Sequence, residues 1–336
     1  MRLAGALWPF WLMRGNIVEG GRRLETALAA YGAVEARLSG PPSNELLADL
    51  SWALTGAGAM AEARGDYAGS CAYLERSLSV RRAMGDKKFI AAALHNLAQA
   101  VRGEGDLVRA RQLIEESLAI HREVGNKTGL ANSLGTLGTI AYSQGDYAAA
   151  LSYFEECLAL CRELHKLHPL ANNLNDLGSL LLQMGEHARA RALLEESLAL
   201  ARELGDRPLM GEALDNLGQL AADQGDFSLA ISLQKESLDQ YRQADHLRVI
   251  SQVLAHLALA LGALGHAEEA SRLLGASEAA RVATHYQLTP ADKGRIERGL
   301  ATIRSNTQID HRHLEAAYNE GLTMTLEQAI DSALQA

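Results

Sequence analysis

The sequence is poor in several residue types, and each scarcity narrows the class of protein. Only three cysteines and six prolines occur among the 336 residues, and aromatic residues make up 5%. A sparse, odd-numbered set of cysteines does not form a disulfide framework and fits a reducing compartment. Few prolines and aromatic residues, together with abundant alanine and leucine, favour helices over sheets. The composition therefore predicts an all-α globular protein of the cytoplasm.

Basic residues are also outnumbered by acidic ones. The chain has 32 Lys and Arg residues against 41 Asp and Glu residues, which gives a net charge of −9. A surface that binds nucleic acid needs clustered basic residues to neutralise phosphates, whereas the arginines of this chain are scattered. We therefore expect no direct contact with nucleic acid.

Long apolar runs are absent as well. The strongest apolar run is the first thirteen residues, MRLAGALWPFWLM, which is shorter than the about 20 residues that span a membrane. Arg14 and Gly15 follow it, where a signal peptide would have a cleavage site of small residues. The sequence predicts neither a membrane span nor secretion.

What the sequence does contain is one pattern that returns every forty residues. A glycine followed by an acidic residue marks each return. Gly265 continues the series, and Gly15 extends it backwards at a distance of fifty residues from Gly65. A second series of the same kind lies between the members of the first. The first series is Gly65-Asp66, Gly105-Asp106, Gly145-Asp146, Gly185-Glu186 and Gly225-Asp226, and the second is Gly85-Asp86, Gly125-Asn126, His165-Lys166, Gly205-Asp206 and Ala244-Asp245.

The segments between these turns have the periodicity of helices. In residues 93–104, for example, Leu94, Leu97, Ala98 and Val101 recur at steps of three and four residues. The glycine supplies the left-handed residue that ends a helix, and the acidic residue after it accepts the first N–H groups of the next helix. Neither helix can bury its apolar face alone, so the pairs must stack on their neighbours.

This pattern resembles the tetratricopeptide repeat. In residues 173–198, NLNDLGSLLLQMGEHARARALLEESL, Gly178 occupies the small site of the first helix and Ala190 the crossing site of the second. The period exceeds the usual about 34 residues and resembles the kinesin-light-chain type. The resemblance implies a right-handed α-solenoid of helix-turn-helix repeats over residues 1–285, with a C-terminal helical cap. We expect about seven hairpins, with turns near residues 15, 65, 105, 145, 185, 225 and 265.

The two ends depart from the repeat. The first unit is incomplete, and Pro9 is expected to interrupt its first helix. Residues 286–336 form a C-terminal helical extension, in which Thr289 is the predicted N-cap of a helix that begins at Pro290. Further helices are expected over residues 310–321 and after Thr325.

The C-terminal extension resembles the C-termini of bacterial signalling ATPases of the LuxR and AfsR types. Their tetratricopeptide region acts as a sensor, so the resemblance implies a sensor or partner-binding module in bacterial signalling or transcriptional regulation. The phosphate-binding GxxxxGK[ST] pattern of those ATPases does not occur in this chain.

Catalytic and metal-binding motifs are missing too. HExxH, GxSxG and CxxC do not occur. Cys157 and Cys161 share one face of a helix, but they have no further soft donors beside them, and we interpret them as packing residues. The sequence therefore predicts a protein that is not an enzyme, with no catalytic residue, no cofactor and no metal site.

Polar residues on the first helices are better candidates for a site. In tetratricopeptide repeat proteins these helices line the concave surface. Asparagine is a mediocre helix former, yet its amide can pair with both groups of a peptide backbone, the role that the resemblance implies for Asn96 and Asn216. Arg102 is a candidate partner for a carboxylate. The predicted contact residues are Asn96, Gln99, Arg102, Asn132, Asn172, Asn175, Asp176, Asp215, Asn216 and Gln219, and the same row contains Thr136, Thr139, Ser179, Glu212 and His256.

Two alternatives remain at this stage. The polar row either contacts a ligand, or it has no ligand and its members are solvated on the concave wall or hydrogen-bond between neighbouring repeats. The ligand is a protein or peptide in the leading hypothesis and a small-molecule inducer in the second, while an enzyme is disfavoured. We expect a monomer or weak self-association.

Overall fold

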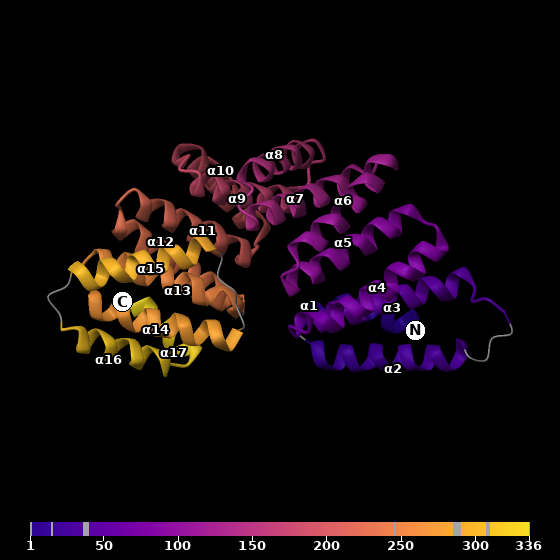
Figure 1. Cartoon of the computed structure of the whole chain (residues 1–336), viewed down its shortest axis with the longest axis horizontal. Helices are drawn as coiled ribbons and strands as arrows, with labels where there is room; N and C mark the ends of the chain where they lie inside the picture. The colour runs from indigo at the N-terminus through magenta and orange to yellow at the C-terminus, as the bar shows by residue number, and fades with distance from the viewer. Residues whose placement is uncertain are drawn as a thin grey trace. The chain divides into compact units, whose positions relative to one another are not determined.

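The computed structural model describes residues 2–14, 16–35, 40–244, 246–284, 290–306 and 310–335. Over these ranges the chain forms α-helices with one short 3₁₀ turn and no strand (Figure 1), which confirms the all-α prediction. Gly15, Asp245 and Thr289, which the sequence places at turns or caps, lie outside the described residues. The helices are α1 (Arg2–Met13), α2 (Ile17–Glu35), α3 (Asn44–Ala63), α4 (Tyr67–Met84), α5 (Lys87–Glu104), α6 (Leu107–Glu123), α7 (Lys127–Ser143), α8 (Tyr147–Glu163), α9 (Leu167–Gln183), α10 (His187–Leu204), α11 (Arg207–Asp223), α12 (Phe227–Gln243), α13 (Ile250–Ala263), α14 (Ala267–Thr284), α15 (Pro290–Asn306), α16 (His311–Leu322) and α17 (Leu326–Gln335).

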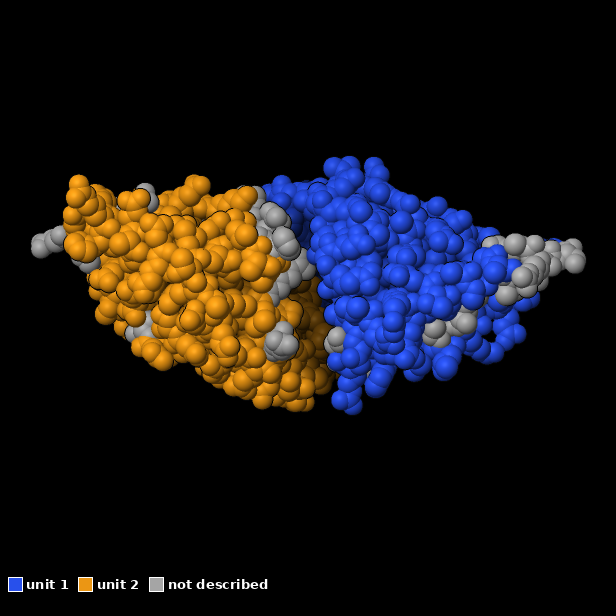
Figure 2. Space-filling model, turned by 90° about the horizontal axis from the view of Figure 1, so that it is seen from below, with its two compact units in different colours: residues 1–164 blue, residues 165–336 orange. Residues whose placement is uncertain are grey.

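The chain divides into two compact units, residues 1–164 and residues 165–336, which Figure 2 colours separately. Unit 1 contains α1 to α8 and unit 2 contains α9 to α17. Within each unit an odd-numbered helix pairs with the even-numbered helix that follows it, from α1 with α2 to α13 with α14, and successive pairs pack on each other. None of the helices in the described ranges is long and apolar enough to cross a membrane.

Most turns have the predicted chemistry, and Glu186 is the exception in the first series because its side chain makes no capping hydrogen bond to α10. Gly65, Gly105, Gly145 and Gly225 all have a positive φ, and the aspartate after each accepts a hydrogen bond from the backbone N–H three residues on. Asp106, for instance, accepts from the N–H of Arg109 at 3.0 Å. Glycine has no Cβ and adopts this left-handed conformation without strain, so each glycine ends one helix and each aspartate begins the next.

A serine in each second helix ties its hairpin together. The hydroxyl of Ser117 donates to the backbone carbonyl of Ala91 at 2.9 Å, and the same bond recurs in every hairpin from α3–α4 to α13–α14. Cys157 takes the serine's position in the α7–α8 hairpin, where its thiol lies 3.2 Å from the carbonyl of Ala131. The bond satisfies a buried polar group inside the hairpin. The other pairs are Ser77–Ser51, Ser197–Ala171, Ser237–Gly211 and Ser277–Ser251.

Small residues let the two helices of a hairpin approach each other. A Cβ on Gly178 would lie 2.7 Å from the Cγ of Leu194, so a larger residue here would require the Leu194 side chain to move. Ala98, at the same repeat position in α5, is fully buried. The small site predicted from the sequence therefore lies where α9 packs against Leu194 of α10.

The expected break at Pro9 is wrong. Helix α1 continues through Pro9, although proline removes one helical hydrogen bond. Packing explains the difference: Trp8 covers Gly56 of α3 and Trp11 covers Gly20 of α2, with space for no Cβ at either glycine. These contacts hold both sides of the proline in place.

The C-terminal helices pack on the last hairpin. Helix α16 lies against α14 so closely that a Cβ on Gly275 would overlap the carbonyl oxygen of Tyr318, and α17 also packs on α14. Helix α15 packs on α13, where Ile303 fills the space above Gly262. The extension thus covers two faces of the terminal pair.

Candidate binding site on the first helices

The predicted contact residues lie on first helices in both units, but their surroundings differ. In unit 1, Asn132 and Arg102 are exposed, and Asn96 and Gln99 are partly exposed. Arg102 donates to the amide oxygen of Gln99 at 3.1 Å on the same helix. Within the described residues, Asn96 and Asn132 make no hydrogen bond to a neighbouring repeat. Their amides are available to a ligand.

The neighbouring threonines are used within their own helix. The Thr136 hydroxyl donates to the carbonyl of Asn132 at 3.1 Å, and the Thr139 hydroxyl donates to the carbonyl of Gly135 at the same distance. Such bonds to the preceding turn satisfy the hydroxyl locally. These two residues therefore contribute less to the open face of unit 1 than the asparagines do.

His95 stands beside this face and carries no charge at neutral pH. Burial, together with repulsion from the nearby His121 and Arg102, lowers its pKa to about 4. With the imidazole neutral, the positive charge on this face is the Arg102 guanidinium, six residues after Asn96 on α5. The face combines two free amides with one positive charge, which suits an extended chain that ends in, or carries, a carboxylate.

In unit 2 the same row is connected from repeat to repeat. The Asn216 amide on α11 donates to the amide oxygen of Asn175 on α9 at 3.0 Å, and Asn175 donates to Glu212 at 3.3 Å. Further along, the ring Nδ1 of His256 on α13 lies 2.9 Å from the carboxylate of Asp215 on α11. Hydrogen bonding between neighbouring repeats, one of the two alternatives left open by the sequence, therefore describes these side chains.

The remaining predicted residues of unit 2 have local partners. Gln219 donates to Asp215 at 3.2 Å on its own helix. The amide of Asn172 lies 3.0 Å from His168 Nδ1, and the other ring nitrogen of His168 lies 3.0 Å from Asp206. Asn172 thus belongs to the turn end of α9 and is not brought together with Asn216.

Glu212 is the member of this network with the most altered acidity. Burial, together with repulsion from the carboxylates of Asp176, Asp206 and Asp215, raises its pKa to about 7. The carboxyl therefore binds a proton more readily than an exposed glutamate does. Asp176 lies within the electrostatic reach of this group and contributes to the effect.

Helix α15 covers part of the row in unit 2. On α13 it packs against Leu259 and Gly262, which occupy the repeat positions of Gln99 and Arg102 on α5. Arg295 of α15 reaches across to α11 and pairs with Asp223 at 3.3 Å. The C-terminal extension thus occupies in unit 2 the positions that stay open in unit 1.

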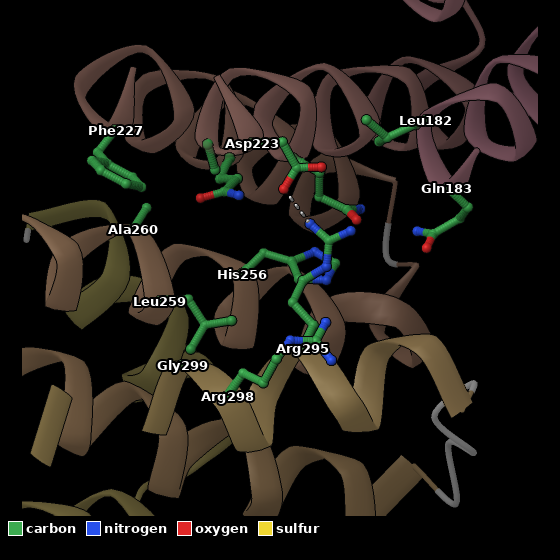
Figure 3. Close-up of a pocket in the computed structure, with 13 residues that line it drawn as sticks. Leu182, Gln183, Asp223, Phe227, His256, Leu259, Ala260, Arg295, Arg298 and Gly299 are labelled. Atoms are coloured by element: carbon green, nitrogen blue, oxygen red, sulfur yellow. Dashed lines mark hydrogen bonds and ion pairs between the residues drawn. The ribbon is translucent and has the colours of Figure 1, made fainter. Parts of the chain in front are cut away.

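A cavity of about 380 Å³ lies beneath α15 (Figure 3). Helices α9, α11, α12, α13 and α15 all contribute to its wall. Two of the residues there, Gln219 and His256, belong to the predicted row, while sequence reasoning missed the other polar ones. The missed polar residues are Gln183, Asp223, Gln234, Arg295 and Arg298.

A protein-family model also matches the repeats of this chain. The model described as the tetratricopeptide repeat matches residues 49–123, 89–163 and 169–243, which together make up more than half of the chain. The chain belongs to the tetratricopeptide repeat family. Its forty-residue period makes it a member of the long-repeat type, and the matched ranges contain helices α4 to α8 and α10 to α12 in full and nearly all of α9.

Solved structures with a similar fold are distant in sequence. A Rap protein complexed with competence and sporulation factor is 12% identical with a TM-score of 0.61, over 98% of this chain and 88% of that one. A signal transduction ATPase with a tetratricopeptide repeat sensor, from Pyrococcus horikoshii, is 17% identical with a TM-score of 0.59, and the match covers 87% of this chain and 45% of that protein. BtubC from P. vanneervenii is 22% identical with a TM-score of 0.53, over 66% and 93%. These likenesses show the fold. No curated protein matches the sequence.

Proposed function

We propose that this tetratricopeptide repeat protein is a non-catalytic scaffold or sensor that binds a protein or peptide on the first helices of unit 1. The observation that carries the proposal is the contrast between the two units. Asn96 and Asn132 keep their amides available, whereas the corresponding part of the row in unit 2 is bonded internally or covered by α15.

The chemistry of this face suits an extended peptide. Each asparagine amide offers one donor and one acceptor group to a backbone, and Asn96 and Asn132 lie on the first helices of consecutive repeats, α5 and α7. Arg102 adds a cation for a carboxylate of the partner. Binding by a row of such residues follows the general manner in which grooves recognise extended segments.

The setting that we propose is bacterial signalling or regulation in the cytoplasm. Two proteins of similar fold support it: the Pyrococcus ATPase carries a tetratricopeptide repeat sensor, and the Rap protein is complexed with competence and sporulation factor. We infer that the present chain has a comparable sensing or partner-binding role. Catalysis has no support in the arrangement of its side chains.

The test is affinity capture with the full chain and a triple variant, Asn96→Ala with Gln99→Ala and Asn132→Ala. Partners identified with the wild-type chain are then measured individually by calorimetry. We expect the triple variant to keep its circular dichroism spectrum and melting temperature and to bind at least about tenfold more weakly, since each lost amide contact costs on the order of 1 kcal/mol.

A matched control distinguishes this face from the rest of unit 1. Arg76, Gln112 and Glu156 are exposed on the second helices α4, α6 and α8, and their replacement by alanine should leave affinity unchanged. Full affinity of the first-helix variant, or equal loss in both triple variants, would contradict the proposal.

A further inference from the structure

Gln234 breaks the repeat pattern at a core position. The corresponding residue of the other second helices packs against the small site of its first helix and is always apolar. Gln234 instead places an amide there and is 1% exposed. The residues at the same repeat position are Leu74, Ile114, Phe154, Leu194 and Leu274.

The amide of Gln234 is not satisfied by the protein. Within the described residues, its oxygen Oε1 is buried and has no hydrogen-bond partner. A buried acceptor without a partner destabilises the fold by roughly 1–3 kcal/mol, and an apolar residue at this position would avoid that cost. A buried unsatisfied group in a native structure therefore calls for a role outside packing.

Gln234 lies at the wall of the cavity beneath α15, where a ligand can be the partner that its amide lacks. Gln234 lines it from α12, while Gln183 and Gln219 line it from α9 and α11. The volume of about 380 Å³ lies in the range of about 300–1,000 Å³ that small-molecule sites occupy. The space is too small for a folded partner and large enough for a compact metabolite.

Among the described residues, the cavity wall carries more positive than negative charge. Arg295 and Arg298 of α15 both line it (Figure 3), and Asp223, which pairs with Arg295, is the one carboxylate among the lining residues that the structure describes. Guanidinium groups bind carboxylates with parallel hydrogen bonds. The Asp223 pair holds Arg295 in position, and Arg298 lies one turn further along the same helix.

Asp215 fixes another part of the wall. His256 lines the cavity and is 3% exposed, and its Nδ1 lies 2.9 Å from the Asp215 carboxylate. This contact with the Asp215 carboxylate holds the ring in one orientation before any ligand arrives. A wall that is ordered in advance lowers the entropy cost of binding.

We propose that this cavity binds a small organic acid that also carries a hydrogen-bond donor, of the size of an amino acid or a hydroxy acid. The carboxylate of the ligand lies at Arg295 and Arg298, and its ammonium or hydroxyl group donates to Oε1 of Gln234. This site is separate from the protein-binding face proposed for unit 1 and does not depend on it.

The experiment uses the full chain and a defined set of probes: the twenty L-amino acids, L-lactate, L-malate and citrate, each at millimolar concentration. Thermal unfolding identifies ligands, because one that binds the native state raises the melting temperature with its concentration. We expect at least one probe to do so, and its methyl ester, which lacks the carboxylate, to lose the effect. If no probe shifts the melting temperature, the proposal is wrong.

Gln234→Leu separates a ligand contact from a structural role. Because leucine restores the apolar residue of the other repeats, we expect this variant to melt at a higher temperature than the wild type without ligand, and to lose the ligand response.

Arg298→Ala, at an exposed side chain, should keep the fold and weaken the affinity for the ligand at least tenfold by calorimetry. Gln240→Leu on the same helix, outside the cavity, should change neither binding nor the response. An undiminished response in Gln234→Leu and Arg298→Ala would overturn the assignment.

Discussion

A single residue, His165, takes a conformation that the other turns assign to glycine. Its φ is +51°, and no other non-glycine residue in the described part of the chain has a positive φ. The left-handed conformation places Cβ close to the following carbonyl oxygen, at a cost of roughly 1–2 kcal/mol. Lys166 after it also provides no side-chain cap for α9.

We therefore expect His165→Gly to stabilise the protein by about 1 kcal/mol, a little less than the strain because glycine is more flexible when unfolded. Urea unfolding followed by circular dichroism measures the change. The reverse substitution, Gly205→His, introduces the same strain at a glycine turn and should destabilise by a similar amount. A lower stability of His165→Gly would show that the imidazole makes contacts that outweigh the strain.

Glu212 gives the stability of unit 2 a dependence on pH. Its pKa rises from the ordinary glutamate value of 4.5 to about 7 on folding, so between these values the folded chain holds a proton that the unfolded chain has lost. Stability must then fall as the pH rises from 4.5 to 7. The shift corresponds to at most about 3 kcal/mol, and less here because the side chain is partly exposed to water.

Glu212→Gln removes this dependence, because an amide cannot ionise and its oxygen can still accept from Asn175. We expect the variant to be more stable than the wild type at pH 8 by roughly 1–2 kcal/mol, with little difference at pH 4.5. Urea titrations at both pH values test this. Glu156→Gln, at an exposed carboxylate of α8, is the control and should show no comparable gain. An equal gain at both pH values would attribute the effect to packing instead of ionisation.

At the level of single residues, the sequence predicts repeated features better than exceptions. The glycine turns, the aspartate caps and the small site at Gly178 all follow from periodicity, and the structure confirms them. Gln234 was missed although it interrupts an apolar series in the same register, because polar candidates for a site were sought on the first helices only. Whether the polar row faces a ligand or a neighbouring repeat depends on distances such as that between Asn175 and Asn216, which spacing alone does not give.

Among the helices, prediction succeeded where local signals decide and failed where packing decides. The forty-residue period defines the helices from α4 to α12 because each lies between two turns of the two series. Helix α1 continues through Pro9 because Trp8 and Trp11 pack on either side of it. The helices of the C-terminal extension were expected, but not that α15 would lie on α13.

The position of α15 also determines which residues of the polar row are open and which line a cavity. In the sequence, Gln219 and Gln99 are equivalent positions of one repeating helix. In the structure Gln219 lines a cavity that α15 helps to form, whereas Gln99 is on a helix without such a cover. One row of side chains therefore provides two kinds of surface, an open one in unit 1 and an enclosed one in unit 2.

Across the whole molecule, the regular register makes one repeat replaceable by the next. Deletion of residues 87–126 joins Asp86 to Lys127, so that Asp86 caps α7 in place of α5, and every serine–carbonyl bond of the remaining hairpins stays intact. We expect this variant to remain helical and to unfold cooperatively, at a lower temperature because one interface between repeats is lost.

Deletion of residues 107–126 is the matched control. It removes α6 alone, leaves α5 without its partner helix and exposes the small and apolar face of α5 that includes Ala98 and Val101. We expect loss of cooperative unfolding and aggregation, measured by calorimetry and light scattering. Similar behaviour of the two deletions would contradict the idea that the hairpin is the replaceable unit.

The serine–carbonyl bond has a consequence for the history of such a chain. Both of its partners lie in the same hairpin, so a gene segment that encodes one hairpin carries the complete bond with it. Unequal recombination between copies would lengthen or shorten the protein by whole hairpins, and every hydroxyl and carbonyl of these bonds would keep its hydrogen-bond partner. The exchange of Ser for Cys at position 157 fits this autonomy, because the change is accommodated inside one hairpin, against the carbonyl of Ala131.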